Sequence, residues 1–140
     1  MGIIPTGAVH LFTLNQRFEV TVGFKDATRA DFAFHLQLCS LCYRMGVTAV
    51  RYAGSLGNAT PGQVYQAVWA LKQMSGLEIR IHAHNDFGMA VANSVAAVAA
   101  GAINVDCTLT GTGEGASNCD YNKLVKLMLR HEPQGRRTFT

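Results

Sequence analysis

The sequence is short of charge and contains no long hydrophobic run. Only 15% of its 140 residues are charged, its formal net charge is +3, and its basic residues form no cluster before Arg130. Nothing in this pattern indicates nucleic-acid binding. The most apolar stretch, residues 89–102, is interrupted by Asn93 and Ser94, and it falls short of the roughly 18 residues that a membrane span needs. With no charged-then-apolar leader either, the sequence predicts a soluble cytoplasmic protein with one compact domain.

Cysteine is also scarce, with four residues in the chain. Cys39 and Cys42 lie three apart in a predicted helix, and Cys107 lies in a predicted strand. Such residues are usually buried thiols in a reducing compartment. The C-S-L-C spacing would also suit redox or zinc chemistry, but no second C-x-x-C motif or nearby histidine completes a site of that kind. We therefore predict buried free thiols.

Hydrophobic periodicity switches between two and 3.6 residues along the chain, as it does where strands alternate with helices. The predicted strands are residues 18–24, 48–53, 77–84 and 104–109, and the predicted helices are residues 31–45, 61–74, 89–100 and 118 onward. Thr60-Pro61 marks the start of one helix, and Gly46, Gly76 and Gly101 mark three helix ends. This order predicts a parallel α/β fold.

Four β/α units spaced by about 30 residues predict half of a TIM barrel, because a complete (β/α)₈ barrel needs about 250 residues. Four parallel strands cannot close on themselves, so they form an open sheet or pair with a half supplied by a second chain. We expect the isolated chain to self-associate through its strand edges. Residues 1–17 are assigned to an irregular N-terminal segment, 18–131 to the half-barrel domain and 132–140 to a flexible tail.

The most informative stretch is I-R-I-H-A-H-N-D-F-G at residues 79–88. Strand alternation puts His82 and His84 on one face, where both imidazoles can point at the same ion, and Asp86 is the predicted N-cap of the helix that follows. Parallel α/β folds bind ligands at this end of their strands. A divalent ion held by His82 and His84 is the main hypothesis, and two structural histidines bonded to backbone are the alternative.

Four other residues are candidates for a site at the same edge of the sheet. Asn118 can give a carbonyl oxygen to the ion or cap the helix that begins there. Glu114, the only acid in the glycine-rich loop at 111–118, is the candidate catalytic residue. Ser55 and Asn85, which follow two predicted strands, are candidate substrate-binding residues, although a serine between glycines is usually a turn residue.

Four motifs stand out along the chain. They are V-G-F-K-D-A-T-R-A-D at 22–31, S-L-G-N-A-T-P at 55–61, I-H-A-H-N-D-F-G-M-A-V-A-N-S at 81–94 and G-T-G-E-G-A-S-N at 111–118. In order and spacing they resemble the metal-dependent barrel enzymes that include homocitrate synthase, isopropylmalate synthase, citramalate synthase and 3-hydroxy-3-methylglutaryl-CoA lyase. Within that family, the chain looks most similar to the homocitrate synthases of nitrogen-fixing bacteria.

The resemblance implies that this chain is the second half of such a barrel, strands five to eight. It implies His82, His84 and Asn118 as ligands of Mg²⁺, Mn²⁺ or Zn²⁺, and Ser55 as the match for a threonine that holds a 2-oxoacid carboxylate. The implied reaction is acyl transfer from acetyl-CoA to a 2-oxoacid, with 2-oxoglutarate favoured. In that reaction the ion polarises the ketone while a base removes a proton from the acetyl methyl group.

Several family positions differ in this sequence. The family's first strand, which carries an Asp ligand followed by Arg and Glu, has no counterpart, and Lys25, Gly54 and Gly115 stand where the family has Glu, Asp and Arg. One hypothesis is an acyltransferase component that is completed by a complementary half-barrel chain or by oligomerisation. The second is a truncated, catalytically inactive paralogue with a binding or structural role. A metal-dependent hydrolase is a weaker third hypothesis, because it needs further histidine and aspartate ligands.

Overall fold

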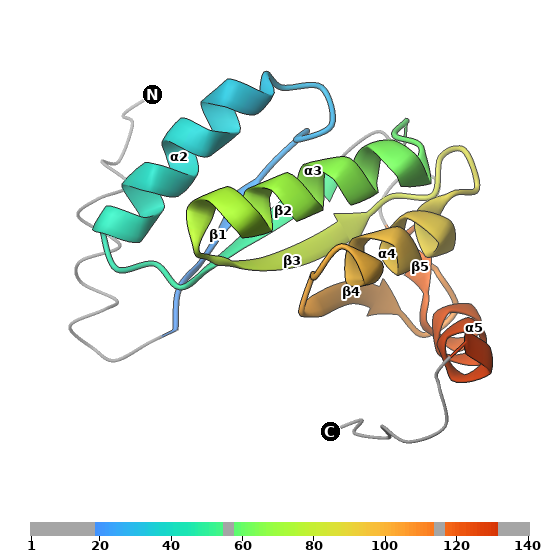
Figure 1. Cartoon of the computed structure of the whole chain (residues 1–140). Coiled ribbons are helices and arrows are strands. Elements are labelled where there is room, and N and C mark those ends of the chain that lie inside the picture. Colours follow the sequence, from blue (N-terminus) through green and yellow to red (C-terminus); the bar gives the residue numbers. More distant parts are fainter. Residues whose placement is uncertain (1–18, 55–57, 114–116, 132–140) are drawn as a thin grey trace.

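The computed structural model describes residues 19–54, 58–113 and 117–131, which form one parallel sheet with helices along one of its faces (Figure 1). The elements are β1 Thr21–Phe24, α2 Phe32–Arg44, β2 Ala49–Gly54, α3 Pro61–Ser75, β3 Glu78–Ala83, α4 Ala90–Ala99, β4 Asn104–Thr108, β5 Cys119–Asp120 and α5 Tyr121–His131. The strands follow chain order, and every neighbouring pair is parallel. The predicted parallel α/β fold is therefore confirmed.

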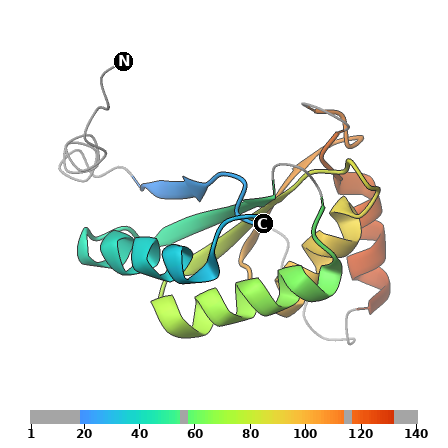
Figure 2. The ribbon, with the colours of Figure 1, turned by 90° about the horizontal axis from the view of Figure 1, so that it is seen from above.

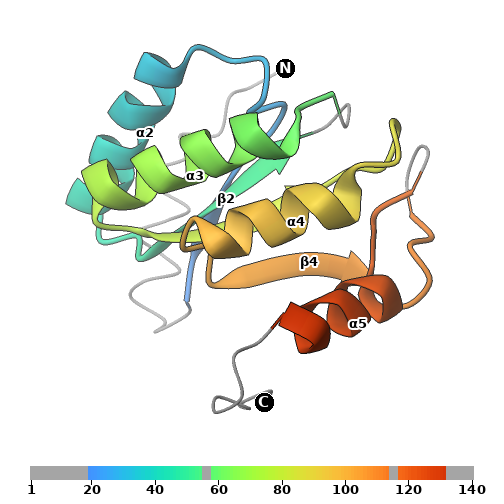
Figure 3. The same cartoon turned by 45° about the vertical axis from the view of Figure 1, so that its right-hand side comes forward.

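The two faces of the sheet differ. Figure 2 shows α2, α3, α4 and α5 on one side of the strands, while the other side carries no helix from the described ranges. Figure 3 shows α3 and α4 crossing in front of the strands on the covered side. None of these helices is long and apolar enough to cross a membrane. The uncovered side, which we call the helix-free face, is the one that matters for the candidate site.

The structure differs from the sequence-based prediction in the fourth unit. The helix predicted from residue 118 begins at Tyr121, and the residues before it form the short strand β5. Cys119 of β5 pairs in register with Cys107 of β4 and is fully buried, so burial and the pairing hold this segment in the sheet. A two-residue strand is too short to produce a periodic pattern. The assigned N-terminal segment and tail lie outside the described residues.

Helix α3 begins and ends at the predicted signals. The Thr60 backbone N–H donates to the Gln63 side-chain oxygen at 2.9 Å, and the Gln63 N–H donates back to the Thr60 hydroxyl at 3.4 Å, which forms a capping box ahead of Pro61. Gly76 ends the helix with a φ of 68°. This left-handed conformation carries little penalty for glycine, which explains why a glycine stands at the helix end.

The core lies between the sheet and the helices. Val50, Ile79 and Ile81 from the strands pack with Val68 and Leu71 from α3, and each of these side chains is at most 2% exposed. Because side chains alternate along a strand, the residues between the buried isoleucines of β3 project from the helix-free face. The histidine motif lies at those alternate positions, so the packing of the core fixes the direction in which the histidines point.

His35 is a buried histidine of α2 that lies apart from the candidate site. Its ring stacks on Phe24 with a centroid distance of 5.3 Å and meets Tyr52 edge-on at 5.8 Å. Burial lowers the pKa of His35, although the charge of Asp31 opposes this shift. Burial also raises the pKa of Tyr52 to about 12. The folded chain therefore holds a neutral imidazole between two neutral aromatic rings.

We expect the free energy of unfolding to fall as the pH drops below about 6.5, the ordinary pKa of histidine. Below that pH, His35 takes up a proton in the unfolded chain but not in the folded chain, so a lower pH favours unfolding. The loss of stability stops growing once the pH falls below the lowered pKa of folded His35. Urea unfolding at pH 7.5 and 5.5 would measure the loss, and His35→Leu should show less of it. Burial also lowers the pKa of His82, which is present in both proteins and contributes the same acid dependence to each. An identical acid dependence in the variant would contradict this role of His35.

Candidate metal centre

His82 and His84 lie at the C-terminal end of β3, on the helix-free face. Their Nε2 atoms are 3.2 Å apart, and the ring planes cross at 77°. Two nitrogens that each lie about 2.1 Å from one ion, at an angle between tetrahedral and octahedral, are separated by roughly 3.0–3.4 Å. The rings therefore converge as the strand pattern predicts, at a separation that suits a shared divalent ion.

Two charged residues that the sequence-based hypothesis missed adjoin His82. Asp106 of β4 is its register partner, and Oδ2 of Asp106 lies 3.3 Å from Nδ1 of His82. Nη1 of Arg51, on β2, lies 3.1 Å from the same oxygen. Aspartate is depleted in strands, so the sequence N-V-D-C-T did contain a signal. The register that brings Asp106 beside His82 could not be read from it.

The surroundings of His82 favour the neutral ring. Burial lowers the pKa of His82 below its ordinary value; Asp106 opposes this shift, while His84 and Arg51 add to it. A neutral imidazole keeps a lone pair on one of its nitrogens, and this is the form that binds metals. The electrostatics of the site are therefore compatible with a ligand role near neutral pH.

Asn118 lies beside the histidine pair because the glycine-rich loop folds back to β3. His84 and Asn118 form an isolated antiparallel bridge, and the Asn118 backbone N–H donates to the Gly111 carbonyl at 2.7 Å. The side-chain Oδ1 of Asn118 is buried and has no hydrogen-bond partner within the described ranges. Since buried carbonyl oxygens are normally bonded, this unpartnered acceptor fits a ligand of a hard divalent ion.

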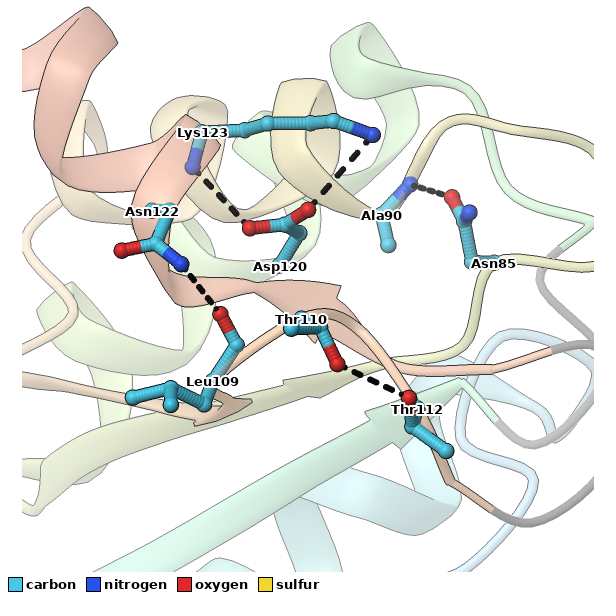
Figure 4. Close-up of polar contacts among 8 residues, drawn as sticks. All are labelled: Asn85, Ala90, Leu109, Thr110, Thr112, Asp120, Asn122 and Lys123. Atoms are coloured by element: carbon cyan, nitrogen blue, oxygen red, sulfur yellow. Dashed lines mark hydrogen bonds and ion pairs between the residues drawn. The ribbon is translucent and has the colours of Figure 1, made fainter.

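The sequence left open whether Asn118 caps the last helix. In the structure, Asp120 caps it. The Lys123 backbone N–H donates to Oδ1 of Asp120 at 3.1 Å, and the Lys123 ammonium lies 3.5 Å from Oδ2 (Figure 4). The Asn122 amide donates to the Leu109 carbonyl at 2.7 Å, which ties the start of α5 to the end of β4. The capping alternative for Asn118 is therefore wrong.

Asn85, a predicted substrate-binding residue, also supports the start of α4. Its Oδ1 accepts a hydrogen bond from the Ala90 backbone N–H at 3.0 Å (Figure 4). The predicted N-cap, Asp86, is exposed, and the actual N-cap residue, Met89, makes no side-chain cap bond. The prediction for Asp86 is wrong because a turn, closed by the Gly88 N–H on the Asn85 carbonyl, brings Asn85 to the helix start.

Two predicted site residues, Ser55 and Glu114, remain to be considered, together with two positions that differ from the family, Gly54 and Gly115. Ser55, Glu114 and Gly115 lie outside the described residues, so the structure does not place them. Gly54 is buried, and a Cβ added there would lie 3.1 Å from Cγ2 of Thr28. An aspartate at position 54, as in the family, would therefore require Thr28 to move.

The cysteines are free thiols, as predicted. Cys39, Cys42 and Cys119 are buried and Cys107 is partly exposed. Burial raises the pKa of Cys39 to about 11, and burial also raises the pKa of Cys119. Both thiols therefore stay protonated at neutral pH, which excludes thiolate chemistry for them. The C-S-L-C pair is part of the core.

The described residues supply only part of a metal site. Within them, no group of three or more His, Cys, Asp and Glu side chains gathers as potential ligands. The cavity that touches His82 and His84 has a volume of about 10 Å³, which is room for about one water molecule. The described residues alone therefore form neither a full set of ion ligands nor a substrate-sized cavity at the histidine pair.

A parallel sheet in chain order, with helices on one face and a histidine pair at the carboxyl end of a strand, is the architecture of a section of a (β/α)₈ barrel. Residues 8–138 match the HMGL-like family, and the chain belongs to that family.

Curated relatives are synthases. Homocitrate synthase subunit alpha of Clostridium pasteurianum is 44% identical over 130 residues, covering 93% of this chain and 48% of that protein. Homocitrate synthase of Frankia alni is 41% identical over 112 residues, with coverage of 80% and 32%. 2-isopropylmalate synthase 2 of Caldanaerobacter subterraneus subsp. tengcongensis is 36% identical over 114 residues, with coverage of 81% and 30%. The chain thus spans about half or less of the length of these relatives.

Solved structures confirm the partial-barrel fold. An HMG-CoA lyase from Acinetobacter baumannii superposes with a TM-score of 0.77 at 22% identity, covering 89% of this chain and 45% of that one. The carboxyl transferase domain of Rhizobium etli pyruvate carboxylase superposes with a TM-score of 0.74 at 19% identity, covering 87% and 22%. At these identities the likeness concerns the fold alone.

Proposed function

We propose that this chain supplies half of the active site of a homocitrate synthase-like acyltransferase, which condenses acetyl-CoA with 2-oxoglutarate at a divalent ion. The observation that carries the proposal is the convergence of His82 and His84, with Nε2 atoms 3.2 Å apart, next to Asn118, which bridges to His84 and whose buried Oδ1 has no hydrogen-bond partner among the described residues. Two of the relatives named above are homocitrate synthases and one is a 2-isopropylmalate synthase, which supports this class of reaction.

The residues of this chain have distinct roles in the proposal. His82 and His84 hold the ion through Nε2, and Asn118 holds it through Oδ1. Mg²⁺, Mn²⁺ or Zn²⁺ bound there supplies Lewis-acid polarisation of the 2-oxoacid ketone. Ser55 and Asn85 bind the substrate carboxylate; Asn85 has its amide nitrogen for this, since its carbonyl accepts from Ala90. Glu114, which lies outside the described residues, is the candidate catalytic residue.

The helix-free face requires a complementary half-barrel. It carries the ion pairs of Arg80 with Glu19 and of Arg51 with Asp106, and the described residues give its histidine pair no third His, Cys, Asp or Glu ligand and no substrate-sized cavity. The complement is a second chain or another part of the same polypeptide. The Clostridium relative is named as a subunit, which supports separate chains. The covered face, with four helices packed on it, already has the form of a barrel exterior.

Complementation tests the proposal. We expect acetyl-CoA-dependent thiol release with 2-oxoglutarate and Mn²⁺ only when this chain is mixed with a chain made from the part of the Clostridium subunit that the match leaves out. His82→Ala or His84→Ala should lower the rate at least 100-fold, because each removes an ion ligand. Gln73→Ala, a change at an exposed position of α3, is the control and should leave the rate within about twofold.

The outcome of that mixture also separates the two hypotheses. Association of the two halves without any thiol release would contradict the acyltransferase role and would favour the inactive paralogue. Release with another 2-oxoacid, but not with 2-oxoglutarate, would retain the reaction class and correct the substrate.

A further inference from the structure

We propose that Asp106 is a positioning residue that fixes the tautomer of His82, so that Nδ1 carries the proton and Nε2 presents its lone pair to the ion. The use of that lone pair rests on the proposed function. The hydrogen-bond arrangement itself needs no ion and can be tested without one. In general, histidine ligands of metals donate their second N–H to a carboxylate or carbonyl, which sets both the tautomer and the ring orientation.

The contact between Asp106 and His82 follows from the sheet. The two residues are register partners on β4 and β3, and Oδ2 of Asp106 lies 3.3 Å from Nδ1 of His82. This is longer than the usual N–H···O distance of about 2.9 Å, and Nδ1 of His82, which is buried, makes no hydrogen bond in the described part of the chain. A rotation of the His82 ring toward Asp106 would form one. Since an ionised carboxylate can only accept, the pair is satisfied when Nδ1 carries the proton.

Arg51 holds the carboxylate in place. Its Nη1 lies 3.1 Å from Oδ2 of Asp106, the same oxygen that faces His82. Arg51 belongs to β2, so its side chain reaches across β3 to Asp106 on β4. The guanidinium donates to this oxygen and so holds the carboxylate beside Nδ1 of His82.

The tautomer proposed for His82 also predicts the tautomer of His84. Nε2 of His82 and Nε2 of His84 are 3.2 Å apart, which is hydrogen-bonding distance. If His82 is protonated at Nδ1, its Nε2 is an acceptor and His84 must donate from Nε2. In the ion-free chain, the two histidines should therefore be opposite tautomers.

Long-range ¹⁵N–¹H NMR of the full chain, labelled at histidine and studied without metal at pH 8, tests the inference directly. The expected result is His82 protonated at Nδ1 and His84 protonated at Nε2. Single His→Gln variants assign the signals of the five histidines. A His82 ring protonated at Nε2 in the unaltered chain would overturn the proposal, whatever any variant does.

A substitution then tests the consequence for the ion. Asp106→Ala should abolish the Nδ1–H signal of His82 and weaken Mn²⁺ binding, measured by calorimetry, by about 10–100-fold. Asp86→Asn removes the same charge from an exposed position near the site and should change neither readout more than about twofold. Asp106→Asn retains an acceptor oxygen and should retain part of the Nδ1–H signal. Circular dichroism confirms that each variant is folded.

The two proposals can fail separately. The chain could show the expected tautomers and yet bind no Mn²⁺, even with a complementary half. That result would support the role of Asp106 and contradict the metal-dependent function. A folded Asp106→Ala variant that keeps the tautomer of His82 would overturn the positioning role and leave the metal site standing.

Discussion

Replacing Gly113 with alanine is expected to weaken Mn²⁺ binding by at least about tenfold while the chain stays folded. A Cβ at this position would lie 2.0 Å from Nδ2 and 2.7 Å from Cγ of Asn118. Contacts this short do not occur, so the Asn118 amide must rotate or the loop must shift. Either movement changes the position of Oδ1, the proposed ligand atom of Asn118, relative to the histidine pair. Calorimetric titration of the chain, alone or with its complement, would measure the loss.

Gly62→Ala is the matched control for that variant. Gly62 lies in the first turn of α3, and a Cβ added there meets nothing within 4 Å. Alanine in a helix is more favourable than glycine, so this variant should gain about 0.5–1 kcal/mol of stability and keep its Mn²⁺ affinity. Equal losses of affinity in both variants would show that the effect of Gly113→Ala is unrelated to Asn118.

Truncation of Leu71 to alanine should reduce the free energy of unfolding by about 2–5 kcal/mol. The side chain is fully buried between α3 and the sheet, where it belongs to the same cluster as Val68 and Ile79. Such a loss is a large part of the 5–15 kcal/mol that typically stabilises a domain. Urea unfolding followed by circular dichroism would measure it at pH 7.5.

Leu129→Ala makes the same chemical change at a site that is 52% exposed, in α5. Because little apolar surface leaves water there on folding, we expect a loss below about 1 kcal/mol. Comparable losses from the two substitutions would contradict the position of Leu71 in the core, or would show that the outer side of α5 is covered in solution.

Local patterns predicted most of this fold. A period of two put His82 and His84 on one face, and Thr60-Pro61 and Gly76 marked α3, because these signals depend on neighbours in the chain. β5 and Asp106 depend on pairing between segments that are distant in the sequence. Residues His82 and Asp106 are separated by the whole of α4, so only the strand register shows that they meet.

The candidate site was only partly predicted, because it too depends on contacts between segments that are distant in the sequence. Asn118 was selected by its place in a motif, and the structure adds the unpartnered oxygen and the bridge to His84. Asn85 and Asp86 are adjacent, and which of them reaches the start of α4 depends on the turn between them. Ser55 and Glu114 lie outside the described residues and stay predictions.

The ionic character of the helix-free face affects how a barrel could be assembled from parts. Barrel interiors are usually filled by branched apolar side chains, which would aggregate if half of such an interior met water. Here the charges of Arg51 and Arg80 are already neutralised by Asp106 and Glu19 within the same chain. When a second half covers this face, its charged groups lose water. Because each already has a counterion, this costs less free energy than burying an unpaired charge. A complementary half of the kind proposed above would therefore meet a surface of paired charges and not an exposed apolar interior.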